Sequence, residues 1–284
     1  MSLTNKIHIG FQNDLGGKTL VSDRTVDAAF PIENLTNQEK GSPARWDASA
    51  FTTLQLRYTS ATAYKANGFF LKGHNLTEDA TIQVILHADE NYSGTESDTG
   101  ALTVKHAIPW GEMIAGIDQW AGHYDDASKL DTIFTAAFDG FEYKSVTINI
   151  SEPNPVNDIV ELDKIALCYM WSPNVSVKMG VVKAIEELMD EVTITRAGGI
   201  FVDELPRRRS MSVVFGAQSD SGFSQLFHIL EKTGMGSDLY VMLNPNSTGF
   251  EKYVTGSFFR RTNRNSGRRF AWNLNEQELA LLEN

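Results

Sequence analysis

Most of this sequence consists of short runs in which apolar and polar residues alternate, each ending at Gly, Asn, Asp or Pro. Clear examples are Phe51–Tyr58, Thr81–His87 and Lys144–Ile150. A period of two predicts a strand with one buried face, because successive side chains of a strand point to opposite sides. Strands at this spacing, separated by turn residues, predict a mainly β chain built as a sandwich.

The length and a shift in composition predict two β domains. A chain of 284 residues allows one large all-β domain or two medium ones. We place a boundary at Ser172-Pro173-Asn174, so that residues 30–171 form one β-sandwich and residues 172–284 form a second barrel or sandwich. Residues 1–29 are expected to be an arm or edge strand that joins the second domain or a neighbouring subunit.

One segment of the second domain predicts a helix. Ser219, Asp220 and Ser221 are N-cap residues, and Gly234 ends the pattern. Between them, apolar residues recur at helical spacing: Phe223, Leu226, Phe227 and Leu230. Residues 181–191 contain good helix formers with apolar residues three and four apart, but they can also be an extended run leading into the next strand. Both a helix and a strand are therefore possible there.

Residues 105–140 interrupt the strand pattern with many aromatic side chains. We expect an excursion with short helical turns folded over one end or face of the sandwich, since an exposed patch of this size would favour aggregation. Trp110, Trp120 and Tyr124 are candidate glycan contacts, because aromatic faces stack on sugar rings. The alternative is a small core beneath the excursion, which we favour for most of them, with Trp120 and Tyr124 the most exposed.

The sequence predicts no catalytic residue, no cofactor and no metal. The single cysteine, Cys168, lies in an apolar run, excludes an intramolecular disulfide and is expected to be an inert buried thiol. There is no Gly-x-Ser-x-Gly elbow, and the six histidines have no metal-ligand spacing. A structural calcium at 123–126 or 89–91 is the open alternative, although solvated turns explain these carboxylates better.

Charge limits the partners. The net charge of −11 lies entirely in residues 1–170, which carry 12 basic and 23 acidic side chains. An acidic surface disfavours nucleic acid, so we expect no nucleic acid sequence recognition. The second part is balanced and contains basic clusters that we interpret as inter-subunit contacts: Arg207, Arg208, Arg209, Arg260, Arg261 and Arg264. With no long apolar run and no signal peptide, we expect synthesis in a host cytoplasm and no membrane insertion.

Several stretches of the first domain resemble a known module. They are Phe30–Leu35, Ala44-Arg-Trp46-Asp47, Asn67–Leu76 and Ala80–Val84. Together they are similar to the galactose-binding-like (discoidin-like) jelly roll found in bacteriophage tail proteins. The shared features are an early Trp-containing turn, a strand ending in Gly-His-Asn-Leu and a following Ala-Thr-Ile strand.

The second part resembles the ring-forming domain of phage distal tail or upper baseplate proteins. The resemblance rests on Gly199, the strand Arg207–Phe215, the helix, and Tyr240–Pro245. It implies a structural virion protein, not an enzyme, at the tail tip. A homo-oligomeric ring, a trimer or hexamer, would connect the tail tube to the baseplate hub or tail fibre, with the jelly roll outward, where it can bind host surface glycan.

Two other functions remain open. The first domain can act as a stand-alone carbohydrate-binding adhesion module. A polysaccharide-cleaving enzyme, which needs two carboxylates from separate positions, is the less favoured reading, with candidates Asp125, Asp126, Asp131 and Asp139.

Overall fold

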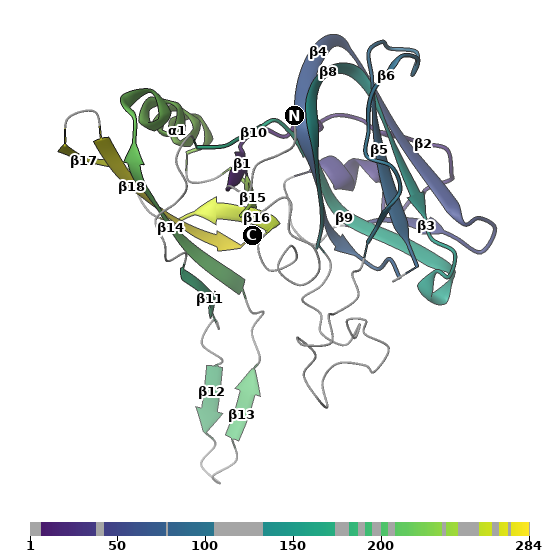
Figure 1. Ribbon diagram of the computed structural model, residues 1–284. Helices are drawn as coiled ribbons and strands as arrows, with labels where there is room; N and C mark the ends of the chain where they lie inside the picture. The colour runs from purple at the N-terminus through teal and green to yellow at the C-terminus, as the bar shows by residue number, and fades with distance from the viewer. Residues whose placement is uncertain are drawn as a thin grey trace, which may run out of the picture. The chain divides into compact units, whose positions relative to one another are not determined.

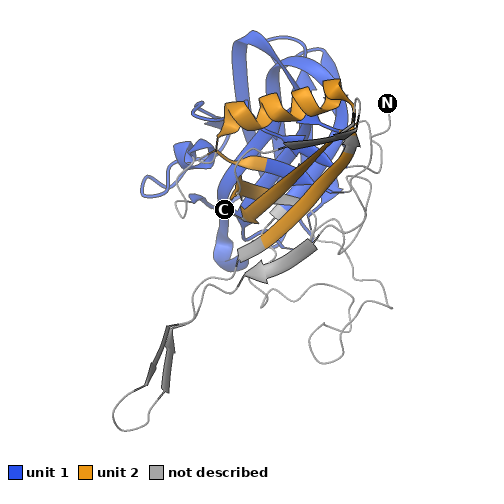
Figure 2. Ribbon diagram, turned by 90° about the vertical axis from the view of Figure 1, so that its left-hand side faces the viewer, with its two compact units in different colours: residues 1–172, 240–257 blue, residues 173–239, 258–284 orange. Residues whose placement is uncertain are grey.

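The computed structural model describes residues 7–37, 43–77, 79–104, 133–173, 182–186, 191–194, 200–203, 208–234, 237–243, 256–262, 267–271 and 274–283. This part of the chain is mainly β with one α-helix, which confirms the predicted fold class (Figure 1). The chain divides into unit 1, residues 1–172 and 240–257, and unit 2, residues 173–239 and 258–284 (Figure 2). None of its described helices is long and apolar enough to cross a membrane.

Unit 1 is a sandwich made from one antiparallel sheet. The strand order is β3-β9-β4-β8-β5-β6, with β2 also paired to β4 and β7 to β5. The strands are β2 (Val21–Ser22), β3 (Ala44–Asp47), β4 (Thr53–His74), β5 (Thr81–His87), β6 (Thr95–Asp98), β7 (Leu102–Thr103), β8 (Ile133–Ser151) and β9 (Ile159–Cys168). Two short 3-10 helices, η1 (Ile32–Thr36) and η2 (Val156–Asp158), lie in its loops.

Strands β4 and β8 are long enough to serve both halves of the sandwich. Their register shifts between Thr59 and Tyr64 and again between Ala66 and Gly68. Such irregularities bend a strand, so one strand can turn the corner between two packed layers. Most of the strand predicted at Phe51–Tyr58 and of the strand ending in Gly-His-Asn-Leu therefore belongs to the single strand β4.

The expected excursion ends earlier than predicted. Residues 133–140 belong to β8, so the prediction that the excursion extends to residue 140 is wrong there. Phe134, Thr135, Ala136 and Phe138 are all buried. Because consecutive residues are buried, this part of β8 lacks the alternation by which a half-buried strand is recognised in a sequence.

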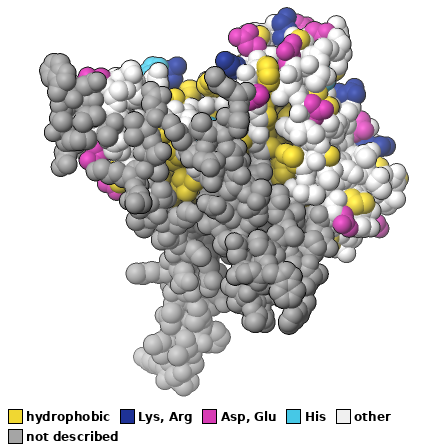
Figure 3. Space-filling view, in the orientation of Figure 1, with side chains coloured by type: hydrophobic (Ala, Val, Ile, Leu, Met, Phe, Trp, Pro, Cys, Tyr) yellow, Lys and Arg dark blue, Asp and Glu magenta, His cyan; other side chains and the backbone are white. Residues whose placement is uncertain are grey.

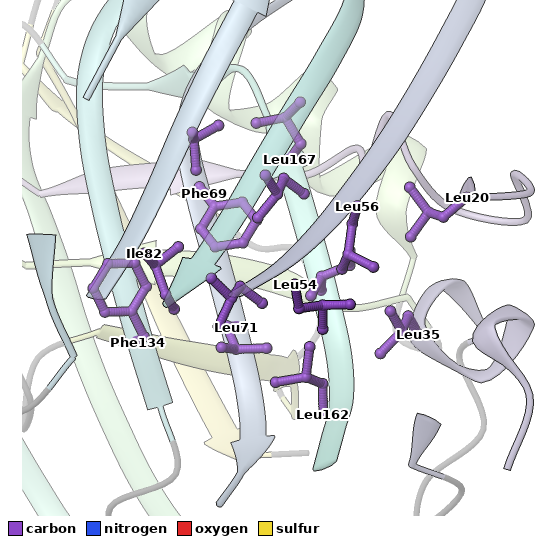
Figure 4. Packing of buried hydrophobic residues seen from close by; sticks show 14 of the residues in the cluster. Leu20, Leu35, Leu54, Leu56, Phe69, Leu71, Ile82, Phe134, Leu162 and Leu167 are labelled. Carbon is purple, nitrogen blue, oxygen red and sulfur yellow. The ribbon is translucent and has the colours of Figure 1, made fainter. Parts of the chain in front are cut away.

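The interior of unit 1 is one apolar cluster (Figure 4). Alternate residues of β4, β5 and β8 point into it, as the period of two predicts. In β9, residues 164–168 are all buried, which fits the nearly continuous apolar run there. The side chains labelled in Figure 4 are Leu20, Leu35, Leu54, Leu56, Phe69, Leu71, Ile82, Phe134, Leu162 and Leu167.

Strand β1 brings together three distant parts of the chain. Strand β1 (His8–Gly10) pairs antiparallel with β10 (Met170–Trp171) and with β15 (Leu239–Met242). The ring of Phe70 from β4 lies 5.5 Å from that of Tyr240. A Cβ at Gly10 would overlap the sulfur of Cys168, so the absence of a side chain there allows the strands to approach closely.

Unit 2 contains an antiparallel sheet on which β14 and β18 are central. β18 pairs with β14, β16 and β17, and β14 pairs with β11. A two-stranded hairpin, β12 with β13, forms a separate sheet. The strands are β11 (Val182–Glu186), β12 (Glu191–Ile194), β13 (Ile200–Asp203), β14 (Arg208–Gln218), β16 (Gly256–Arg261), β17 (Gly267–Ala271) and β18 (Leu274–Glu283).

The helix α1 (Asp220–Thr233) begins and ends where the sequence predicts. The hydroxyl of Ser219 accepts a hydrogen bond from the N–H of Gly222, and Gly234 forms the C-cap with φ of 59°. Leu226 and Leu230 are buried, whereas Phe227 is 39% exposed. Residues 182–186 form a strand, which settles the open choice there in favour of the extended reading.

Candidate functional site

A groove at one end of the unit 1 sandwich is the best candidate site. It has a volume of about 830 Å³. Three separate segments form it, and we call it the Arg24 groove. Its lining residues are Arg24, Thr25, Val26, Asp27, Arg45, Trp46, Asp47, Ser49, Ala50, Phe51, Asn157, Asp158 and Ile159.

Strand β3 holds the three segments together. Trp46 forms an isolated bridge with Val26 on one side and pairs with Val160 of β9 on the other. The Trp46 side chain is fully buried, and its indole N–H donates to the hydroxyl of Ser22 at 3.1 Å. The N–H of Ala48 donates to the carbonyl of Asp158 at 2.7 Å. Because these bonds involve both backbone and core, the groove rests on the rigid part of the sandwich.

Arg24 and Phe51 form the wall of the groove. The Arg24 guanidinium lies 5.1 Å from the centre of the Phe51 ring, and its Nε donates to the carbonyl of Thr53 at 3.2 Å. A second hollow of about 530 Å³ shares this wall and continues along Thr52, Thr53 and Pro153. A ligand that extends across both hollows can therefore contact Arg24 and Phe51 from each side of the wall.

Carboxylates and an arginine complete the polar lining. Oδ1 of Asp47 accepts from the N–H of Ser49 at 3.0 Å, and hydrogen bonds from Ser49 lower the pKa of Asp47. Oδ1 of Asp27 accepts from the N–H of Ala29 at 2.9 Å. Arg45 is held by Glu161 and stacks on the Phe30 ring at 3.9 Å. Asp47 is thus a hydrogen-bond acceptor that stays ionised at neutral pH.

The third segment adopts an uncommon backbone. Asn157 and Asp158 have φ angles of 55° and 56°, in the left-handed region that few residues other than Gly adopt. Asn and Asp tolerate it best. Such a conformation directs the chain sharply into β9 and places two polar residues at the groove.

The residues predicted as glycan contacts are in another part of the chain. Trp110, Trp120 and Tyr124 lie outside the described residues, as do the candidate acids Asp125, Asp126 and Asp131. Asp139 is exposed on β8. The Arg24 groove was not predicted, because its lining comes from three short segments that are each ordinary turns in the sequence. Trp46, singled out in the resemblance, was the one available signal.

The predicted basic contacts are only partly described. Arg207 and Arg264 lie outside the described residues, and Arg208 and Arg209 are placed in β14 opposite Glu186 and Ile185. Nε of Arg260 donates to Oδ1 of Asp238 at 3.1 Å. Arg261 is only 7% exposed.

The candidate calcium positions have other uses or are not described. In the turn after β5, Oδ1 of Asp89 accepts from the N–H groups of Asn91 and Ser93 at 3.0 and 2.9 Å. Residues 123–126 lie outside the described part. Among the residues that the structure describes, no three His, Cys, Asp or Glu side chains are grouped to hold a metal ion.

Charged side chains of both signs are interspersed on the described surface of unit 1 that Figure 3 presents. The positive member of the groove wall, Arg24, accordingly has Asp23 beside it at 3.5 Å. A surface of mixed sign does not select strongly for polyanions. The groove therefore suits a ligand recognised by hydrogen bonds and stacking.

No protein-family model and no curated protein matches this sequence. Several solved structures are similar to part of it. One is SpGH29, with 15% identity and a TM-score of 0.38 over 57% of this chain, which spans 28% of that protein. Another is chitosan-binding module 1 of a chitosanase/glucanase from Paenibacillus sp. IK-5, with 12% identity and a TM-score of 0.38, covering 55% of this chain and 98% of that one. The family 32 CBM from C. perfringens NanJ in complex with galactose has 13% identity and a TM-score of 0.35, covering 52% of this chain and 91% of that one. These values describe a partial similarity and carry no argument about function.

Proposed function

We propose that unit 1 binds a saccharide, without cleaving it, in the Arg24 groove. The observation that carries this proposal is the stacked pair of Arg24 and Phe51 at the wall shared by two hollows. A sugar ring has an apolar face and a rim of hydroxyls, so it is recognised by an aromatic or guanidinium plane together with fixed polar groups. Asp47, Asp27 and Asn157 supply such groups around the pair.

The chemistry of Asp47 suits a hydrogen-bond acceptor and not the proton donor of a glycosidase. Glycoside hydrolysis needs one carboxylic acid with a raised pKa to protonate the leaving oxygen. Hydrogen bonds from Ser49 lower the pKa of Asp47 instead. An ionised Asp47 accepts hydrogen bonds from sugar hydroxyls, which fits a binding role for this residue.

Oligosaccharide binding by the full chain tests this function. A glycan array should identify a ligand, and titration calorimetry with that ligand should show at least a tenfold loss of affinity for Phe51→Ala and for Arg24→Met. The matched control is Tyr169→Ala, because Lys65 stacks on Tyr169 at 5.2 Å in unit 1 away from the groove lining. Equal affinity of the Phe51 variant and the parent, or loss only in the Tyr169 variant, would reject the groove as the site.

We also propose that the chain is a structural component of a bacteriophage tail tip, assembled as a ring between the tail tube and the hub or fibre. The order of β14, α1 and β15 supports this, since the resemblance in the second part implies a strand, a helix and then further strands. The separate hairpin of β12 and β13 also supports it. A two-stranded hairpin is marginally stable alone and gains stability from a partner.

Native mass spectrometry of the purified chain and peptide analysis of purified virions test the structural role. The expected results are an oligomer of ring size, a trimer or hexamer, and peptides of this chain in the tail fraction. A chain that stays monomeric at high concentration and is absent from particles would contradict it.

A further inference from the structure

The two hollows of unit 1 meet along one strip of its surface. The Arg24 groove and the second hollow, of about 530 Å³, have part of their lining in common. The shared residues are Arg24, Ser49, Ala50, Phe51 and Asp158. Both volumes lie in the range of roughly 300–1,000 Å³ that holds drug-sized ligands, so each hollow has more room than one sugar ring needs. A single ring in one hollow therefore leaves the lining of the other uncovered.

A turn with small side chains lies where the two hollows meet. Ser49 and Ala50 form this turn, and both are exposed. The N–H of Phe51 donates to the carbonyl of Ala48 at 3.3 Å and closes the turn. A ligand that crosses from one hollow to the other passes these small residues, with the Phe51 ring beside it.

Backbone hydrogen bonds fix the turn at both ends. Before it, the N–H of Ala48 donates to the carbonyl of Asp158 at 2.7 Å. After it, the N–H of Glu152 donates to the carbonyl of Thr52 at 2.8 Å. A surface that is already ordered in the free protein loses little conformational freedom when a ligand binds. The strip is therefore suited to hold an extended ligand in one defined path.

The two hollows offer different chemistry to such a ligand. The Arg24 groove alone contains Asp27, Arg45 and Asp47. The residues that line only the second hollow are uncharged: Ala48, Thr52, Thr53, Pro153 and Pro155. Sugar rings combine an apolar face with a rim of hydroxyls, so proline rings suit the face and carboxylates suit the rim. Consecutive rings of one glycan can use both surfaces.

The charges of the groove disfavour an acidic ligand. Arg24 lies 3.5 Å from Asp23, and Nε of Arg45 donates to Glu161 at 2.6 Å. Both guanidinium groups are thus beside an acid that lies outside the lining. The carboxylates within the lining are Asp27, Asp47 and Asp158. A uronate or sulfate on the ligand would meet like charges there, which suppresses binding.

We propose that the ligand consists of consecutive units of a linear glycan without acidic substituents, with rings on both sides of the Arg24–Phe51 wall. The inference rests on the proposed saccharide binding and specifies the class of saccharide. One ring beside the wall and one in each hollow require about three linked rings. The site then recognises a stretch of chain, and a single terminal sugar makes only part of the contacts.

Titration calorimetry of the full chain with oligosaccharides of graded length tests the chain-length requirement. The probes are oligomers of one to six rings of β-1,4-linked glucose, β-1,4-linked mannose, β-1,4-linked N-acetylglucosamine and α-1,4-linked glucose, together with any linear glycan that binds on the array. Affinity for the series that binds should rise at least tenfold from one ring to three and then level off. Oligogalacturonides of the same lengths, which carry a carboxylate on each ring, should not bind.

The possible results separate this inference from saccharide binding itself. Equal affinity for one ring and for six, or binding only of acidic glycans, would overturn the ligand class while the Arg24 groove remains a saccharide site. If neither the array nor the titrations show any binding, both proposals are overturned.

Thr52→Trp tests the second hollow. Thr52 is exposed and only its backbone carbonyl bonds to Glu152, so the new ring should fill the hollow without disturbing the fold. This variant should lose the rise in affinity between one ring and three. Thr62→Trp makes the same change at an exposed residue of β4 that lines neither hollow, and it should keep the rise. A Thr52 variant with the length dependence of the parent would exclude the second hollow from the site.

Discussion

The hydroxyl of Tyr143 donates a hydrogen bond of 3.1 Å to Oδ2 of Asp14, and both side chains are buried in unit 1. Burial raises the pKa of Asp14 from 3.8 to about 6, partly offset by this hydrogen bond. The pKa of Tyr143 is raised by its burial and by Asp14, so its hydroxyl remains a donor. The pair places a group that titrates near neutral pH beside the Cys168 thiol, whose pKa burial and Asp14 also raise.

Asp14→Asn should remove a pH dependence of stability. The folded chain holds the Asp14 proton more tightly than the unfolded chain, so the stabilisation is complete below pH 3.8 and is lost as the pH rises through about 6. The loss corresponds to about 3 kcal/mol for a shift of this size. Asn keeps an acceptor for Tyr143 without the charge, so the variant should exceed the parent in stability above pH 6.

Urea unfolding of parent and variant at several pH values between 4 and 7.5 measures this difference, with Glu96→Gln, an exposed site on β6, as the control. Parallel pH profiles for the parent and the Asp14 variant would show that Asp14 does not titrate in this range.

Gly10→Ala should destabilise unit 1, because the new Cβ overlaps the sulfur of Cys168 and lies 3.3 Å from the Cβ of Tyr240. Forcing a methyl group into a packed site costs about 1–3 kcal/mol. In a Cys168→Ala background the overlap with the sulfur is gone. Gly10→Ala should therefore lower the stability less in that background than in the parent chain. Calorimetric unfolding of the parent, the two single variants and the double variant gives the interaction energy between the two positions. Strictly additive losses of stability would argue against the close approach of β1 and β9.

Glu152→Gln should loosen the connection after β8. The Glu152 side chain is 3% exposed, and its carboxylate accepts from the N–H and hydroxyl of Thr77 at 2.6 and 2.5 Å and from the N–H of Asn154 at 3.1 Å. An amide has one acceptor oxygen, so at least one of these partly buried hydrogen bonds is lost, at a cost of about 1 kcal/mol. Chemical unfolding measures this loss of stability, and a variant as stable as the parent would contradict the capping role of Glu152.

Ser219→Ala should lower the stability of unit 2 by about 1 kcal/mol, because the N–H of Gly222 loses the side-chain oxygen that caps α1. Ser219→Asp retains an acceptor and should be close to the parent. Thermal unfolding followed by the helical circular dichroism signal separates the two variants, and similar midpoints for both would indicate that the cap contributes little.

The predictions from sequence succeeded where one local rule governs the structure. Ser219 and Gly234 bound α1 as capping chemistry requires, and alternation located β5 correctly. They failed where tertiary packing decides. The residues around Gly68 and Tyr58 belong to one continuous strand because the sheet bends there, and no local pattern distinguishes a bulge from a turn.

The candidate site was less predictable than the fold. Arg24, Asp47 and Asn157 are far apart in sequence and meet because β3 pairs with β9 and bridges to Val26. Each looks like an ordinary solvated turn residue by itself. Their proximity depends on the register of strands from distant segments, which composition and periodicity do not encode.

The pairing of β1 has a consequence for the order of events during synthesis. His8 to Gly10 are translated before both of their hydrogen-bonding neighbours, which are at residues 170–171 and 240–242. Gly10 precedes Met170 by 160 residues (170 − 10) and Tyr240 by 230 residues (240 − 10), so β1 stays unpaired until β10 has been made and keeps one open edge until β15 has been made. The pairing of β1 with β15 couples His8–Gly10 to a segment made after α1, so a truncated product lacking residues 240–242 would leave one edge of β1 open to other strands.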